Sequence, residues 1–285
     1  MELKKIGIIV TDLPEKFGLP RQSSLAEHLR GFLCFEPEYR DARALEGIEG
    51  FDYLWLVWGF DVPPSDTFRA MVRPPRLGGN AYRGVFATRS PFRPNPLGLS
   101  CVKLEQVLLP GQEGYAEALG EVRSGLRMLA ERGADIVAEG CHAEGGRAEG
   151  ADGTDTPDGT EAAEAEDWAG GPILRVGGID MRSGTVLYDI KPYLPYVEAH
   201  PQARGGFAQE AAGRTLEVDF PQELLERVPE AMRKGLTELL RQDPRPAYQE
   251  DPERVYGLSY GAQNISFRVT GGVLTVTEVK PAADA

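Results

Sequence analysis

The sequence predicts a mainly β protein, with a barrel or a sandwich first and a small α+β unit after it. Short apolar segments recur between Gly and Pro clusters with little helix between them, which is typical of such folds. After Tyr196 the composition shifts to a Gly- and Ala-rich stretch, a helical pattern and a hairpin signal. With 285 residues and 41% hydrophobic content, the chain can bury at least one full core.

The expected strands of the first unit follow one another along the chain. Residues 3–10 (LKKIGIIV) form the first, and residues 51–60 (FDYLWLVWGF) are too apolar and aromatic for anything but a buried strand. Between them, Asp41 could cap a short helix. Further strands are expected at residues 84–88, 99–109, 172–180 and 185–190.

Residues 111–170 interrupt this pattern. Residues 116–133 (AEALGEVRSGLRMLAERG) favour one helix, whereas residues 139–170 are Gly, Ala, Glu and Asp with almost no bulky side chains. We therefore expect an acidic insertion over about residues 111–170 with a disordered tip. The expected domains are residues 1–204, which include this insertion, and residues 205–285.

The second domain combines helix and hairpin signals. A helical pattern covers residues 222–241, and Pro229 either breaks or restarts that helix. The Gly-Gly pair at 271–272 predicts a two-residue hairpin turn. The register of that hairpin places Val269 opposite Leu274 and Phe267 opposite Val276.

The charge is unevenly distributed. A formal net charge of -13 argues at first against a nucleic-acid partner. However, residues 139–167 hold ten acidic residues and one basic one, whereas residues 68–103 hold seven basic residues and no acidic one. The basic span therefore keeps a nucleic-acid partner open.

Cys34, Cys101 and Cys141 are far apart and lack CxxC spacing, so neither a disulfide framework nor a zinc site is expected. The N-terminal segment has no signal-peptide pattern, and no window approaches the ~20 apolar residues of a membrane span. We expect a soluble protein in the cytoplasm, a reducing compartment. No GxGxxG follows a strand and opens a helix, which excludes a Rossmann-type dinucleotide enzyme, and a P-loop is likewise absent.

The densest group of polar side chains lies in residues 87–100 (ATRSPFRPNPLGLS). Three prolines stiffen this segment, so it presents its polar groups with little ordering entropy left to lose. Arg89 and Arg93 offer forked donors for carboxylate or phosphate, and Asn95 offers an amide that can read a base edge. The alternative is a proline-braced loop with solvated arginines.

Two further segments favour the functional interpretation. Residues 16–22 (KFGLPRQ) combine a shaped turn with Arg21 and Gln22. Residues 177–196 (GGIDMRSGTVLYDIKPYLPY) carry carboxylates beside a turn, which can hold an ammonium or ribose hydroxyls or can make local turn hydrogen bonds. Together the three segments indicate a site for an anion or a nucleotide.

These motifs, with residues 73–100 and 242–248 (QDPRPAY), are similar to those of the TsaA-like family of tRNA methyltransferases. The resemblance covers roughly residues 1–110, 171–200 and, more loosely, 236–270. It implies a single-sheeted β-barrel and a homodimer that uses S-adenosylmethionine. The reaction it implies is methylation of the exocyclic nitrogen of threonylcarbamoyladenosine beside the tRNA anticodon.

The resemblance also implies which residues bind S-adenosylmethionine. Asp61 stands where the family usually has histidine, and Val186 stands where it commonly has proline. The implied cofactor set is Pro20, Arg21, Gln22, Asp61, Arg89, Leu99, Asp180, Gly184, Thr185 and Val186.

For the tRNA, arginines of the basic span would contact phosphates, and one could fork onto the threonyl carboxylate. An ordinary solvated face is the alternative for the group from Arg69 to Arg83. The expected substrate-binding residues are Arg73, Arg76, Arg93, Asn95, Lys191, Tyr193 and Arg245.

The sequence identifies no catalytic base and no metal site. Asp180 and Asp189 are candidates for the base, but Asp189 can equally pair with Lys191 or an arginine. The histidines, His28, His142 and His200, lie outside the matched motifs. Two other functions remain open: a methyltransferase for another RNA or a small molecule, and a non-catalytic module that binds S-adenosylmethionine.

Overall fold

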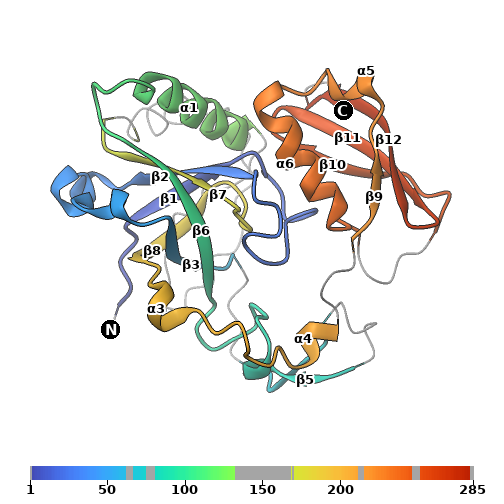
Figure 1. The fold of residues 1–285 in the computed structure, drawn as a ribbon, viewed down its shortest axis with the longest axis horizontal. Helices are drawn as coiled ribbons and strands as arrows, with labels where there is room; N and C mark the ends of the chain where they lie inside the picture. The colour runs from blue at the N-terminus through green and yellow to red at the C-terminus, as the bar shows by residue number, and fades with distance from the viewer. Residues whose placement is uncertain are drawn as a thin grey trace, which may run out of the picture.

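The structure, a computed structural model, shows a barrel joined to a second, smaller sheet (Figure 1). Six strands, all paired antiparallel, close the barrel in the order β1, β2, β7, β6, β3, β8. The strands are β1 Gly7–Thr11, β2 Arg30–Phe35, β3 Tyr53–Gly59, β6 Leu97–Leu108, β7 Ile173–Gly177 and β8 Thr185–Pro192. The described residues are 2–61, 67–74, 81–131, 168, 170–210, 215–245 and 251–282.

The closed sheet confirms the expected single-sheeted barrel, but one predicted strand is wrong. Residues 84–88 are not a strand, because β5 ends at Gly84 and a 3-10 helix follows at Val85–Ala87. The Thr88 hydroxyl and amide both donate to the Val85 carbonyl, at 2.8 and 3.1 Å, and close this turn. β5 (Arg83–Gly84) instead pairs with β4 (Met71–Val72) in a separate two-stranded sheet.

Successive side chains of a barrel strand point to opposite faces of the sheet, so they pack into two different hydrophobic cores. On β1, Ile9 belongs to the main core, whereas Ile8 and Val10 pack under helix α1. Helix α1 (Tyr115–Glu131) confirms the helix predicted near this position and covers one side of the barrel (Figure 1). The acidic stretch after it lies outside the described residues.

Short helices fill the long connections. Asp41 caps the 3-10 helix Ala42–Leu45 as expected, since its carboxylate accepts from the Arg43 amide at 3.0 Å. Other short helices in the described residues before β9 are the 3-10 turns Pro37–Tyr39 and Ile48–Gly50, and helices α3 Pro195–Glu198 and α4 Phe207–Glu210.

The C-terminal part is a four-stranded sheet with helices against it. Its strand order is β10, β11, β12, β9, and the predicted hairpin register of β11 and β12 is confirmed. Pro229 restarts the predicted helix as the N-cap of α6. The elements are β9 Glu217–Asp219, α5 Gln222–Leu225, α6 Glu230–Arg241, β10 Tyr256–Tyr260, β11 Gln263–Thr270 and β12 Val273–Pro281.

The barrel and the C-terminal sheet share one continuous hydrophobic core. Polar contacts fix their docking: Glu238 of α6 accepts from the His28 amide at 2.9 Å and meets His28 Nδ1 at 2.6 Å. The Gly261 amide donates to the Asp12 carbonyl at 2.7 Å. Gly235 allows α6 to approach so closely, because a Cβ there would lie 2.6 Å from the His28 carbonyl oxygen.

Replacing Gly235 by Ala should therefore lower the free energy of unfolding by about 1–3 kcal/mol, despite the better helix propensity of Ala. Gly120 of α1 is the matched control, since nothing lies within 4 Å of a Cβ there. Gly120→Ala should be neutral or stabilising by about 0.5–1 kcal/mol. Denaturant unfolding measures both, and equal effects of the two substitutions would contradict the docking described.

Candidate functional site

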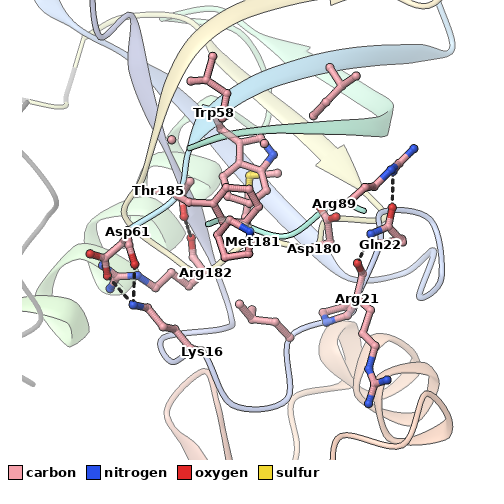
Figure 2. A pocket seen from close by; sticks show the side chains of 18 of the residues that line it. Lys16, Arg21, Gln22, Trp58, Asp61, Arg89, Asp180, Met181, Arg182 and Thr185 are labelled. Atoms are coloured by element: carbon pink, nitrogen blue, oxygen red, sulfur yellow. Dashed lines mark hydrogen bonds and ion pairs between the residues drawn. The ribbon is translucent and has the colours of Figure 1, made fainter. Parts of the chain in front are cut away.

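A cavity of about 720 Å³ opens at one end of the barrel. Its walls come from the β1–β2 loop, the end of β3, the loop before β6 and the β7–β8 turn (Figure 2). Antiparallel pairing explains the gathering, because the end of β3 and the start of β6 lie side by side with Trp58 opposite Gly98. A Cβ on Gly98 would lie 2.2 Å from the Trp58 ring, so glycine is required there.

The cavity brings together most of the residues expected to bind a cofactor. Gly184 and Val186 flank a lining residue but do not line the cavity themselves. The expected cofactor residues that line it are Pro20, Arg21, Gln22, Asp61, Arg89, Leu99, Asp180 and Thr185.

Most residues expected to bind a larger substrate lie elsewhere. Arg93 lines the cavity, but the other described ones do not. Lys191 pairs with Asp189 at 2.8 Å, which confirms the structural role considered for Asp189. Arg245 pairs with Asp243 at 2.8 Å in the C-terminal part. Arg73, Asn95 and Tyr193 are outside the lining, and Arg76 lies outside the described residues.

An ion cluster forms one wall of the cavity. Asp61 Oδ2 lies 3.0 Å from Lys16 Nζ and 3.1 Å from Arg182 Nη2. The hydrogen bond from Lys16, reinforced by the charges of both cations, holds the pKa of Asp61 below its usual range. This wall therefore presents one carboxylate and two cations within a few ångströms.

A buried hydrogen-bond chain forms the floor. Trp58 Nε1 donates to Ser100 Oγ at 2.9 Å, and Ser100 Oγ donates to Asp180 Oδ1 at 2.6 Å. Ser100 is fully buried, so both of these bonds satisfy groups that would otherwise be unpaired. Burial raises the pKa of Asp180 to about 6, although hydrogen bonds from Ser100 and the Ser23 amide oppose the shift.

Two serines tie the β1–β2 loop to the barrel. Ser23 Oγ accepts from the Cys101 amide at 3.1 Å, and Ser24 Oγ donates to the Cys101 carbonyl at 3.2 Å. The neighbouring Gln22 side chain then accepts a hydrogen bond from Arg89. Gln22, Arg89 and Asp180 therefore lie on the side of the cavity away from the ion cluster (Figure 2).

Arg93 has a structural task that its sequence context did not indicate. Its Nη1 donates to the carbonyls of Val85 and Thr88, at 3.2 and 2.8 Å. These bonds hold the loop that carries Arg89 into the cavity wall. The sequence predicted that prolines stiffen this loop, and the hydrogen bonds of Arg93 stiffen it further.

Several lining residues were missed from the sequence, although a signal existed for some. Lys16 and Arg182 lie inside the motifs KFGLPRQ and DMRSG, but only the structure shows that both reach Asp61. Trp58 lies in the apolar strand assigned to the core, and its neighbour Phe60 packs against it with ring centroids 4.3 Å apart. Because this segment is apolar throughout, its sequence did not indicate that the two rings lie at the mouth of the barrel.

Among the described residues, no group of three or more His, Cys, Asp or Glu side chains could hold a metal ion. In the same part of the chain, no helix has the length and apolarity needed to cross a membrane.

Two family models match the chain. The tRNA-methyltransferase O N-terminal domain matches residues 8–116, and the TrmO C-terminal domain matches residues 213–282.

Relatives match over nearly the whole length. A tRNA (adenine(37)-N6)-methyltransferase of Escherichia coli K12 is 32% identical over 288 residues, covering 98% of each protein. One of the same name from Eikenella corrodens is 34% identical, covering 80% of this chain and 97% of the relative. The crystal structure of TrmO from Pseudomonas aeruginosa superposes with a TM-score of 0.62 at 26% identity, covering 99% and 97% of the two chains.

The pKa of Asp180 makes the stability of the fold depend on pH. Because the folded-state pKa of about 6 exceeds the ordinary 3.8, the folded state binds more protons between about pH 4 and 6. The free energy of unfolding should therefore fall as pH rises through this window, by at most about 1.4 kcal/mol per pH unit for this group.

Asp180→Asn should remove that part of the pH dependence, measured by denaturant unfolding at several pH values. A smaller fall of the same sign should remain, because burial also raises the pKa of Asp12 to about 6. The exposed Asp219 on β9 is the matched control for the same substitution. Identical pH profiles for wild type and Asp180→Asn would show that Asp180 is not the group responsible.

Proposed function

The chain belongs to the TrmO family, and we propose that it is an S-adenosylmethionine-dependent enzyme that methylates N6 of adenine 37 in tRNA. The observation that carries the proposal is the barrel-end cavity, most of whose lining residues lie in the part of the chain that the N-terminal family model matches and which sets carboxylates and cations beside apolar walls. We further propose that its substrate is the threonylcarbamoyl form of that adenosine, as the motif resemblance implies.

The cavity fits S-adenosylmethionine in size and chemistry. A volume of about 720 Å³ lies within the range of ~300–1,000 Å³ that is usual for small-molecule sites. Apolar walls that include Trp58, Phe60 and Met181 suit the adenine and thioether portions. A relative from Pseudomonas aeruginosa, RcsF, whose name describes an S-adenosylmethionine-dependent methyltransferase, is 34% identical over 89% of this chain.

The two polar sides of the cavity suggest how the cofactor is oriented. Its methionyl end carries an ammonium and a carboxylate, which match the Asp61 carboxylate and the Lys16 and Arg182 cations respectively. On the other side, Asp180 and Gln22 offer acceptors and a donor for ribose hydroxyls and the adenine edge. Asp61 would thus retain a polar role at a position that is usually histidine in the family.

S-adenosylmethionine supplies an activated methyl group when bound, so the protein needs no nucleophile of its own. The cavity walls align the acceptor nitrogen and exclude water from the transfer. A proton must leave N6 during or after attack. Asp61 is held in two salt bridges, whereas burial raises the pKa of Asp180 to about 6, so Asp180 is the more basic of these two cavity carboxylates and the better candidate to accept that proton.

We also propose a homodimer in the cytoplasm. The family resemblance supports the dimer, which light scattering of the purified protein tests. Cys34 is free and fully buried, and burial raises its pKa to about 12, so it behaves as an inert thiol in a reducing compartment.

Arg182→Gln tests the proposed orientation. It should weaken binding of S-adenosylhomocysteine about tenfold, because a charge-assisted hydrogen bond to the carboxylate is lost. Binding of 5′-methylthioadenosine, which lacks the amino-acid end, should not change. Calorimetry measures both, with Arg43→Gln as control because Arg43 pairs with Asp41 on the surface. Equal losses for both ligands would place the amino-acid end elsewhere.

Transfer is tested with labelled S-adenosylmethionine and tRNA that does or does not carry threonylcarbamoyladenosine, followed by nucleoside mass analysis. Label should appear in the modified tRNA alone. Cofactor binding without transfer to either tRNA would instead support a non-catalytic binding module. Label in another RNA or a small molecule would overturn the proposed acceptor.

A further inference from the structure

Large aromatic rings lie exposed on one projecting segment beside the cavity. We call residues 67–74 and 81–93 the arm; Figure 1 shows its strand β5 together with α4, below the barrel on the side away from α1. Phe86 is 68% exposed, Phe68 55%, Phe92 51% and Tyr82 48%. Exposed aromatic rings gathered in this way mark an interaction surface, since single exposed side chains are ordinary but clusters are not.

Each of these rings has a cation or a second ring beside it. Phe68 and Phe86 stack at 5.9 Å between centroids with planes 26° apart. Arg69 lies 5.9 Å from the Phe92 ring, and Arg93 lies 5.6 Å from the Phe86 ring. Arg73 lies 4.6 Å from the Tyr82 ring. The arm therefore alternates flat apolar faces with guanidinium groups.

The arginines of the arm keep their positive charge available. Among the described residues, no carboxylate lies within salt-bridge distance of Arg69, Arg73 or Arg93, or of Arg83, which lies over the Phe207 ring of α4 at 5.4 Å. Such a combination of cations and aromatic faces is the one that proteins use to bind single-stranded nucleic acid.

The arm also leads directly into the cavity. Phe92 and Arg93 belong to both the arm and the cavity lining. A nucleotide that meets the cofactor at the mouth of the cavity would therefore have its neighbours along the strand lying over the arm. The exposed rings therefore lie next to the place where the target nucleotide would bind, and not on a remote surface.

We infer that the arm is a stacking platform for the unpaired bases that flank the target adenosine, with its arginines binding the adjoining phosphates. This inference rests on the proposed function. Pairing of the arm with the arm of a second copy fits less well, because such a contact would place like charges opposite one another. A base-paired RNA fits less well too, because its bases are stacked within the helix and cannot lie on the rings.

Phe86→Ala and Phe68→Ala test the stacking platform, and neither residue lines the cavity. Each should weaken binding of an anticodon stem-loop RNA about tenfold. Phe86→Leu, which keeps apolar bulk without a ring, should show the same loss. Tyr196→Ala is the matched control, because Tyr196 is 82% exposed but lies on α3, outside the arm.

Salt dependence separates stacking from charge. The slope of log affinity against log salt should be unchanged in Phe86→Ala, whereas Arg73→Gln should reduce it by about 0.7–0.9, the value for one phosphate contact. Binding of a fully base-paired RNA should not respond to Phe86→Ala. The affinity for S-adenosylhomocysteine should stay at the wild-type value in all arm variants.

RNA affinity in Phe86→Ala equal to that in Tyr196→Ala would overturn the inference. So would a parallel loss of S-adenosylhomocysteine binding, or dissociation of a dimer without a change in RNA affinity. Methylation by the wild type keeps the two proposals apart. If the wild type methylates the modified tRNA but the arm variants bind RNA with wild-type affinity, only the stacking platform is rejected. If the wild type does not methylate this tRNA but the arm variants bind RNA more weakly, only the assigned reaction is rejected.

Discussion

The hydrogen-bond chain from Trp58 through Ser100 to Asp180 is the interaction on which the site depends. It joins β3, β6 and the β7–β8 turn beneath the cavity, and Gly98 makes it possible by leaving room for the Trp58 ring. A buried chain of this kind tolerates no missing member, because each group would be left unpaired in a medium of low polarity. The chain therefore fixes the position of the Asp180 carboxylate in the cavity floor.

Much of the fold follows from local sequence, and the exceptions have physical causes. The hairpin at 271–272 and the restart of α6 at Pro229 depend on the backbone preferences of single residues, since Gly271 and Gly272 both have positive φ and Pro229 stands at the N-cap. Strand β2 (RGFLCF) was not predicted, because pairing with distant β7 stabilises it and the short segment offers little alternation. The composition of residues 84–88 predicted a strand, but the hydrogen bond from the Thr88 hydroxyl to the Val85 carbonyl stabilises a 3-10 turn instead.

The site was predictable as motifs but not as a geometry. Arg21, Gln22 and Arg89 were expected from their segments, and all three line the cavity. The contacts of Asp61 with Lys16 and Arg182, however, join residues 45 and 121 positions apart, which no local pattern reveals. The exposed rings of the arm were not predicted either, because the sequence does not indicate whether an aromatic side chain is buried or exposed.

The proposed orientation of the cofactor and the proposed stacking platform together imply one path from cofactor to RNA. The structure of a crystal grown with S-adenosylhomocysteine tests this account most directly. The ligand should lie in the barrel-end cavity, with its amino-acid end against Asp61, Lys16 and Arg182 and its nucleoside toward Gln22 and Asp180. A ligand bound in the reverse direction, or outside this cavity, would contradict the account.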